Sequence, residues 1–324
     1  MQNFIFCLQI KKYINKQIQL ILSQMSNQVK IFKQLQIFTK SNFTNHFHLE
    51  LILRDSKIDE YKAINLGEAL GKCVNLITLT LDLSYNKIRD VGIAGIVKDI
   101  KNCSNLTTLN IYLRDTNIMK EGAALLGIGL GSCKTLISLT LNLKRNNICN
   151  EGAQNLINGL SNCQNLKSLT LILMENNISG SEEFNIGQGL RKLKKLLDLT
   201  LLLKSNKIGN KGSTDLAEEL ANFQHLQHLN LQLQENNINN QGLSRLGFAL
   251  KLCQDLKTLN LDLSNNDNID ESGSIDLVYG IRNCSNIQYL ALILSKNKIG
   301  AVEKKLLNKK FDKMTRLVKK ELKL

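Results

Sequence analysis

One pattern of residues recurs along this sequence at a constant spacing of 30, and no other feature constrains the fold as strongly. Four leucines, an asparagine, an isoleucine and a glycine return in the same order throughout residues 46–300. The register slips once, by one residue after Asn266, and the least regular copy is the first, at Leu49, Leu51 and Leu53. We therefore count nine copies of one unit.

Each copy combines two hydrophobic periodicities. Residues 79–83 alternate apolar and polar side chains, which predicts a half-buried strand. Residues 90–101 place Ile93, Ile96 and Ile100 at helical spacing, which predicts an amphipathic helix. We expect an α/β right-handed solenoid with a parallel inner sheet and outer helices. The 324 residues then form one body, because each strand–helix coil packs only on its neighbours.

An asparagine follows the predicted strand in seven of the nine coils: Asn86, Asn146, Asn176, Asn206, Asn236, Asn266 and Asn297. A buried bend leaves backbone donors and acceptors unpaired, and a short amide side chain can satisfy both. Ser56 and Thr116 occupy this position in the other two coils. The sequence thus predicts an asparagine ladder that is weaker at those two points.

The pattern L-x-x-L-x-L-x-L-x-x-N-x-I-x-x-x-G resembles the leucine-rich repeats of the ribonuclease-inhibitor-like class, over residues 46 to about 300. The chain departs from that class by one extra Leu-x pair before the asparagine, which should lengthen each strand by two residues. The resemblance implies a horseshoe that grips a partner protein on its concave face. It does not imply which partner.

Six cysteines share one position of the repeat: Cys73, Cys103, Cys133, Cys163, Cys253 and Cys284. Leu193 and Phe223 replace cysteine at this position, which indicates a buried apolar site. Adjacent helices pack roughly 8 to 10 Å apart, too far for a disulfide, and no C-x2-C pair indicates a metal site. We expect core thiols in a reducing compartment, cytoplasmic with the nucleus as an alternative.

No set of residues resembles a catalytic, nucleotide-binding or cofactor site. Gly127, Gly129 and Gly131 imitate a dinucleotide fingerprint, but they lie where the repeat predicts a helix. We expect no cofactor, no metal and no enzymatic activity.

The net charge of +14 lies mainly at the two ends of the chain. Residues 1–45 contribute +6, residues 301–324 contribute +6, and the repeats between them only +2. Without a basic stripe along the repeats, no nucleic acid partner is expected. Residues 1–45 predict an N-terminal cap or a partly disordered segment, and Met25 is an alternative start.

In the C-terminal segment 301–324, apolar residues recur at intervals of three and four opposite a lysine-rich side: Leu307, Phe311, Met314, Val318 and Leu322. This spacing predicts a basic amphipathic helix that caps the last coil. Peripheral contact of this helix with an anionic membrane is an alternative that we do not favour. No stretch has the apolar length of a transmembrane span.

The outward residues of the middle coils provide a candidate partner site: Asn142, Lys144, Arg145, Ile172, Met174, Glu175, Leu202 and Lys204. Ile172 and Leu202 are apolar where other coils carry residues such as Asp82 and Gln232. We predict that they anchor a partner with an apolar knob and an acidic rim that meets the lysines and the arginine.

The function expected from these observations is a protein-interaction module or scaffold. Two alternatives stay open. One leucine-rich-repeat family of similar architecture activates the nuclear transport GTPase, although those proteins typically end in an acidic tail and this one is basic. A ubiquitin-ligase substrate receptor would need a ligase-binding domain, for which residues 1–45 are short.

Overall fold

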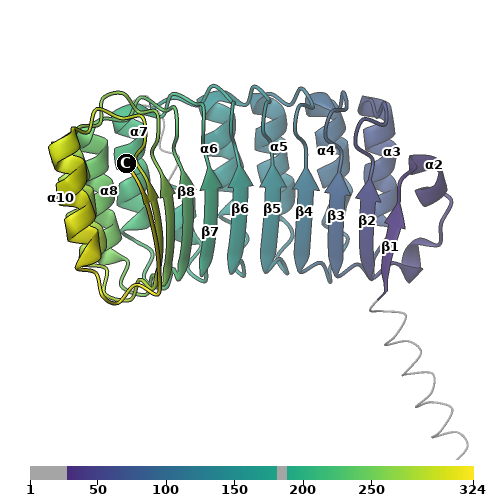
Figure 1. Cartoon of the computed structure of the whole chain (residues 1–324). Helices are drawn as coiled ribbons and strands as arrows, with labels where there is room; N and C mark the ends of the chain where they lie inside the picture. Colours follow the sequence, from purple (N-terminus) through teal and green to yellow (C-terminus); the bar gives the residue numbers. More distant parts are fainter. Residues whose placement is uncertain (1–27, 181–187) are drawn as a thin grey trace, which may run out of the picture.

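The computed structural model describes residues 28–180 and 188–324. These residues form one open, parallel sheet of 11 strands in chain order. Figure 1 shows the strands side by side along the molecule. The strands are β1 (Val29–Phe32), β2 (His48–Ile52), β3 (Thr78–Asp82), β4 (Thr108–Tyr112), β5 (Ser138–Asn142), β6 (Ser168–Ile172), β7 (Asp198–Leu202), β8 (His228–Gln232), β9 (Thr258–Asp262), β10 (Tyr289–Ile293) and β11 (Lys319–Lys323).

Helices connect the strands and cover one face of the sheet, while the other face is open (Figure 1). They are α2 (Leu35–Phe38), α3 (Glu60–Gly71), α4 (Arg89–Ile100), α5 (Lys120–Gly131), α6 (Cys149–Leu160), α7 (Gly209–Leu220), α8 (Asn240–Leu252), α9 (Glu271–Arg282) and α10 (Ala301–Asp312), with short 3-10 helices η1 (Phe43–Asn45) and η2 (Leu190–Lys192). The predicted α/β solenoid with a parallel sheet is confirmed.

The core lies between the sheet and the helices. Leu79 and Leu81 pair in register with Leu109 and Ile111 of the next strand, and all four side chains are buried. Each coil therefore buries its leucines on those of its neighbours. Glycine lets the helices approach: a Cβ atom on Gly159 would lie 2.3 Å from the Gly127 carbonyl carbon. Gly159 is thus needed for helix packing.

The extra leucine of each repeat lengthens the hydrogen-bond ladder between coils. Each regular strand contains five residues, yet the Leu83 amide donates to the Tyr112 carbonyl at 2.8 Å and the Tyr85 amide donates to the Arg114 carbonyl at 2.8 Å. Leu83 is fully buried. The two residues added to the repeat thus keep neighbouring coils aligned beyond the strands themselves.

The asparagines fasten each coil to the preceding one. The side chain of Asn206 accepts hydrogen bonds from the amides of Asn176 and Ile178, at 3.0 and 3.1 Å. Its amide group donates to the carbonyls of Leu173 and Leu203, at 3.0 and 2.8 Å. Because Asn206 is buried, water cannot replace these four bonds.

Thr116 makes a smaller set of bonds at the same position. Its hydroxyl is 2.7 Å from the Leu113 carbonyl of its own coil and 3.2 Å from Asn146 Oδ1 of the next coil. A single hydroxyl proton cannot serve two carbonyls as an asparagine amide does. Ser56 is exposed and bonds the Arg54 carbonyl at 3.2 Å, so it also lacks the full asparagine pattern.

The first coil is closed by an aromatic cluster. Phe38 is fully buried, and its ring centroid lies 5.6 Å from that of Phe43 and 5.5 Å from that of Phe32. His46 is buried against the same rings, and burial lowers the pKa of its imidazole. Strand β1 then extends the sheet beyond β2. Our expectations for residues 1–27, including the alternative start, lie outside the described residues.

The C-terminal segment differs from the single helix predicted over residues 301–324. Helix α10 ends at Asp312, and Lys319–Lys323 form strand β11 in register with β10. Leu307, Phe311 and Met314 are buried in the core, so the apolar side of the helix packs on the protein. The repeat explains the strand, because Leu317, Leu322 and Leu324 continue its spacing.

We expect the substitution Asn206→Ala to lower the free energy of unfolding by about 3 kcal/mol, because it leaves buried backbone donors and acceptors without partners. Thr116→Asn should raise the same free energy by about 1 kcal/mol, because it completes the ladder. Urea denaturation followed by circular dichroism measures both. An Asn206→Ala midpoint equal to that of the wild type would contradict this account of the ladder.

Candidate functional site

Three rows of side chains run across the coils at the open face of the sheet. The strand-end row consists of the last residue of each strand from β2 to β10: Ile52, Asp82, Tyr112, Asn142, Ile172, Leu202, Gln232, Asp262 and Ile293. The post-strand row lies two residues later: Arg54, Ser84, Arg114, Lys144, Met174, Lys204, Gln234, Ser264 and Ser295. The turn row follows with a positive φ angle throughout: Asp55, Tyr85, Asp115, Arg145, Glu175, Ser205, Glu235, Asn265 and Lys296.

Ile172 and Leu202 are direct partners on β6 and β7, so the structure brings the two predicted anchor residues together. Both side chains are partly exposed. Other apolar residues occur in the strand-end row, but Ile52, Tyr112 and Ile293 each have polar or charged neighbours in it. Within the coils from β2 to β10, Ile172 and Leu202 form the row's one adjacent apolar pair.

Three polar members of the strand-end row, Asp82, Asn142 and Asp262, bond their own backbone. Oδ1 of Asp82 accepts from the Ser84 amide at 3.0 Å, and Oδ1 of Asn142 accepts from the Lys144 amide at 3.0 Å. Asp262 does the same. Ile172 and Leu202 have no side-chain acceptor and forgo this bond.

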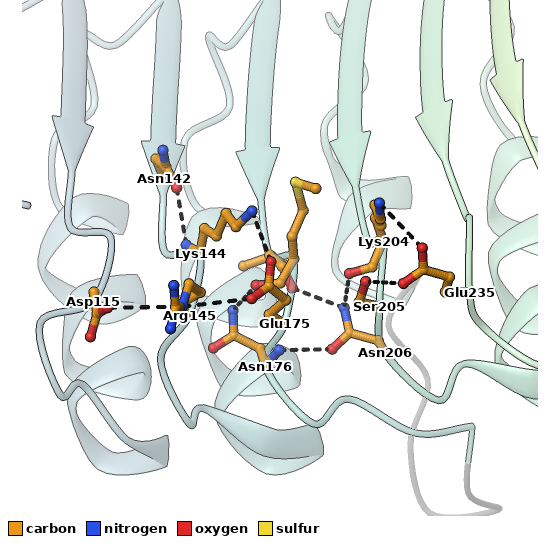
Figure 2. Close-up of polar contacts among 12 residues, drawn as sticks. Asp115, Asn142, Lys144, Arg145, Glu175, Asn176, Lys204, Ser205, Asn206 and Glu235 are labelled. Carbon is orange, nitrogen blue, oxygen red and sulfur yellow. Dashed lines mark hydrogen bonds and ion pairs between the residues drawn. The ribbon is translucent and has the colours of Figure 1, made fainter.

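The charged residues beside the anchor pair with one another across coils (Figure 2). Lys144 Nζ lies 2.8 Å from Glu175, and Lys204 Nζ lies 3.2 Å from Glu235. Arg145 stands between two carboxylates, 3.8 Å from Asp115 and 3.6 Å from Glu175 (Figure 2). The hydrogen bond from Lys144 lowers the pKa of the Glu175 carboxyl. The rim predicted to attract an acidic partner is thus neutralised by the chain itself.

A site that the sequence analysis missed lies three coils earlier. The Tyr85 ring stands between two guanidinium groups, with the Arg54 Cζ atom 4.4 Å and the Arg114 Cζ atom 5.1 Å from the ring centroid. The three residues come from consecutive coils. A sequence feature marks this site once the register is known, because Tyr85 is the only aromatic residue in the turn row from Asp55 to Lys296.

A second apolar surface lies on the helical face, between α3, α4 and α5. It is a groove of about 510 Å³ whose edges include the exposed side chains of Val91, Leu125 and Ile128. In helix α6, Asn155 and Asn158 occupy the positions of Leu125 and Ile128. This apolar groove therefore does not continue onto α6. The sequence analysis assigned no role to this face.

The six cysteines of the repeat are buried, and their thiols bond backbone carbonyls. Cys103 Sγ donates to the Leu70 carbonyl at 3.3 Å, and Cys163 Sγ donates to the Leu130 carbonyl at 3.3 Å. Burial raises the pKa of the Cys103 and Cys163 thiols to about 12. Within the described residues, no three histidine, cysteine or carboxylate side chains converge as metal ligands would.

Comparison with known proteins agrees with this architecture. The family model for the leucine-rich repeat matches residues 75–97, which span β3 and the first part of α4. The chain is a leucine-rich-repeat protein. A search of curated proteins gave no match. Membership of the ribonuclease-inhibitor-like subclass stays a prediction.

No helix among the described residues has the length and apolarity needed to span a membrane. The membrane alternative for the C-terminal segment relied on a continuous apolar side from Leu307 to Leu322. In this leucine-rich-repeat protein that side is interrupted after Asp312, and Leu307 and Phe311 face the core.

We expect the six buried cysteines to resist alkylation by iodoacetamide in the native protein at about pH 8, because only the thiolate reacts and burial raises their pKa values. Cys149, which is partly exposed, should react. Peptide mass spectrometry before and after unfolding in concentrated urea measures this. Native alkylation of Cys73 or Cys253 at the unfolded rate would contradict the burial described here.

Proposed function

We propose that this leucine-rich-repeat protein is a protein-interaction module that binds a partner on the open face of its sheet, with Ile172 and Leu202 as the apolar anchor. The proposal includes no catalytic role. Free buried thiols support a reducing, intracellular location.

The observation that carries the proposal is the adjacency of Ile172 and Leu202 at a position where other coils bond their own backbone. The two apolar side chains remain partly exposed to water and give up a local hydrogen bond. Neither the exposed apolar surface nor the loss of this hydrogen bond stabilises the free protein. Both are useful if a partner covers this surface, because burial of apolar area then contributes to binding.

The ion pairs around the anchor indicate which chemistry the partner surface needs. Glu175 and Glu235 neutralise Lys144 and Lys204, so the surface beside the anchor is held in place and has little net charge. An apolar knob on the partner is sufficient here, and an acidic rim is not needed. This modifies the partner chemistry expected from the sequence.

We expect the double substitution Ile172→Asn and Leu202→Asn to abolish capture of the partner. Asparagine already occupies this position as Asn142, where it accepts a backbone bond, so the free energy of unfolding should stay within about 1 kcal/mol of the wild type. The measurement is quantitative mass spectrometry of proteins that co-purify with the full-length chain.

The matched control is Thr78→Asn with Thr108→Asn, which makes the same number of asparagines at partly exposed positions on β3 and β4. Partners of the anchor are those retained by the wild type and by this control but lost from the first variant. If every protein retained by the wild type is retained equally by the Ile172→Asn, Leu202→Asn variant, the anchor proposal is wrong.

A further inference from the structure

A simple rule pairs charges between neighbouring coils. A cation in the post-strand row meets the turn-row residue of the next coil, so that Lys144 meets Glu175 and Lys204 meets Glu235. The fixed register of the strands produces this rule, because it brings the same two positions together in each pair of coils.

The same rule leaves two arginines without a carboxylate. Arg54 meets Tyr85 in the next coil. For Arg114 the corresponding turn-row residue is Arg145, which is itself a cation and has its own carboxylate partners. In the described part of the chain, neither Arg54 nor Arg114 forms an ion pair, and both guanidinium groups stack on Tyr85. Arg114 helps to lower the pKa of the Glu175 carboxyl through its charge but makes no ion pair with it, so both guanidinium groups keep hydrogen-bond donors for a ligand.

Arg114 has a further unmet requirement. Its Nε atom is buried and has no hydrogen-bond partner within the described structure. A buried cationic donor without an acceptor destabilises the free protein, and an added oxyanion would relieve that cost.

Tyr85 is also an unusual residue for its position. Its φ angle is +60°, a left-handed conformation that bulky side chains rarely adopt, whereas most other members of the turn row are short or flexible. The backbone of the repeat imposes this conformation on every coil. An aromatic ring at this position lowers the stability of the free protein. It also holds the arginines of the two flanking coils in fixed positions.

Nearby carboxylates limit the type of ligand. Asp115 is 3.8 Å from Arg145, and Asp82 accepts the Ser84 amide, while Asp55, which follows Arg54 in the chain, is exposed. These charges offset a general attraction for anions. Recognition must therefore come from directed hydrogen bonds, which a planar guanidinium forms best with a carboxylate, two bonds at a time.

We propose that Arg54 and Arg114, held by Tyr85, bind side-chain carboxylates of an acidic segment in the protein partner. This inference rests on the proposed function, since it names the chemistry of a partner that lies along the open face. The acidic contact is thus expected at the coils of β2 to β4, and the apolar contact at β6 and β7.

The test uses the full-length chain and two fluorescein-labelled peptides, hexaglutamate and hexaglutamine, with binding measured by fluorescence anisotropy. The variant Arg54→Gln, Arg114→Gln should weaken hexaglutamate binding by about tenfold, because it removes charge-assisted hydrogen bonds. The control Lys98→Gln, Lys101→Gln removes the same charge from exposed positions at α4, on the helical side. It should leave hexaglutamate binding near that of the wild type, and hexaglutamine should bind none of the proteins.

Three results would overturn the inference. Equal weakening in both variants would show that only the overall charge attracts the peptide, and unchanged binding in the arginine variant would remove the site altogether. Arginine-dependent binding of an oligothymidylate without binding of hexaglutamate would assign the site to nucleic acid. The Ile172→Asn, Leu202→Asn variant keeps its charge and should still bind hexaglutamate, so failure of the anchor and failure of the acidic contact are distinguishable.

Discussion

Each coil turns from strand to helix through a bend whose amides point inward, and an asparagine of the next coil accepts them. Asn206 shows the complete arrangement, with two bonds accepted and two donated around one buried side chain. A shift of one coil against the next would break the three of these bonds that cross between coils, in an environment without water. The asparagines therefore hold the coils in a single register.

A fixed register places equal positions side by side, and the surface chemistry follows from this. The ion pairs of Lys144 and Lys204 form because the register brings a carboxylate of the next coil within reach. The two sites proposed above are departures from the same regularity. Ile172 and Leu202 break the local bonding of the strand-end row, and Tyr85 breaks the charge pairing of the turn row.

The ends of the sheet show how the repeat stops. At the first coil, Phe32, Phe38 and Phe43 cover the core with aromatic rings in place of a further coil. At the other end the repeat continues with strand β11 after helix α10, and β11 carries lysines along the exposed edge. Charged edge strands oppose pairing with other chains.

The sequence by itself determined the repeat, the parallel sheet, the buried leucines and the positions of the asparagines and cysteines. These follow from the local period and from the burial that each residue type requires. It also placed Ile172 beside Leu202, because a constant spacing implies neighbouring strands. The helix predicted over 301–324 was wrong beyond Asp312, since the four-residue spacing of Val318 and Leu322 fits a helix face and also one face of an extended strand.

Only the tertiary structure decided which charges are satisfied. Lys144, Arg145 and Lys204 were expected to face a partner, yet each pairs with a carboxylate of an adjacent coil. Arg54 and Arg114 drew no attention in the sequence, yet they are the arginines that stack on Tyr85 without an ion pair among the described residues. Pairing depends on distances between side chains of different coils, and these distances exist only once the coils are stacked.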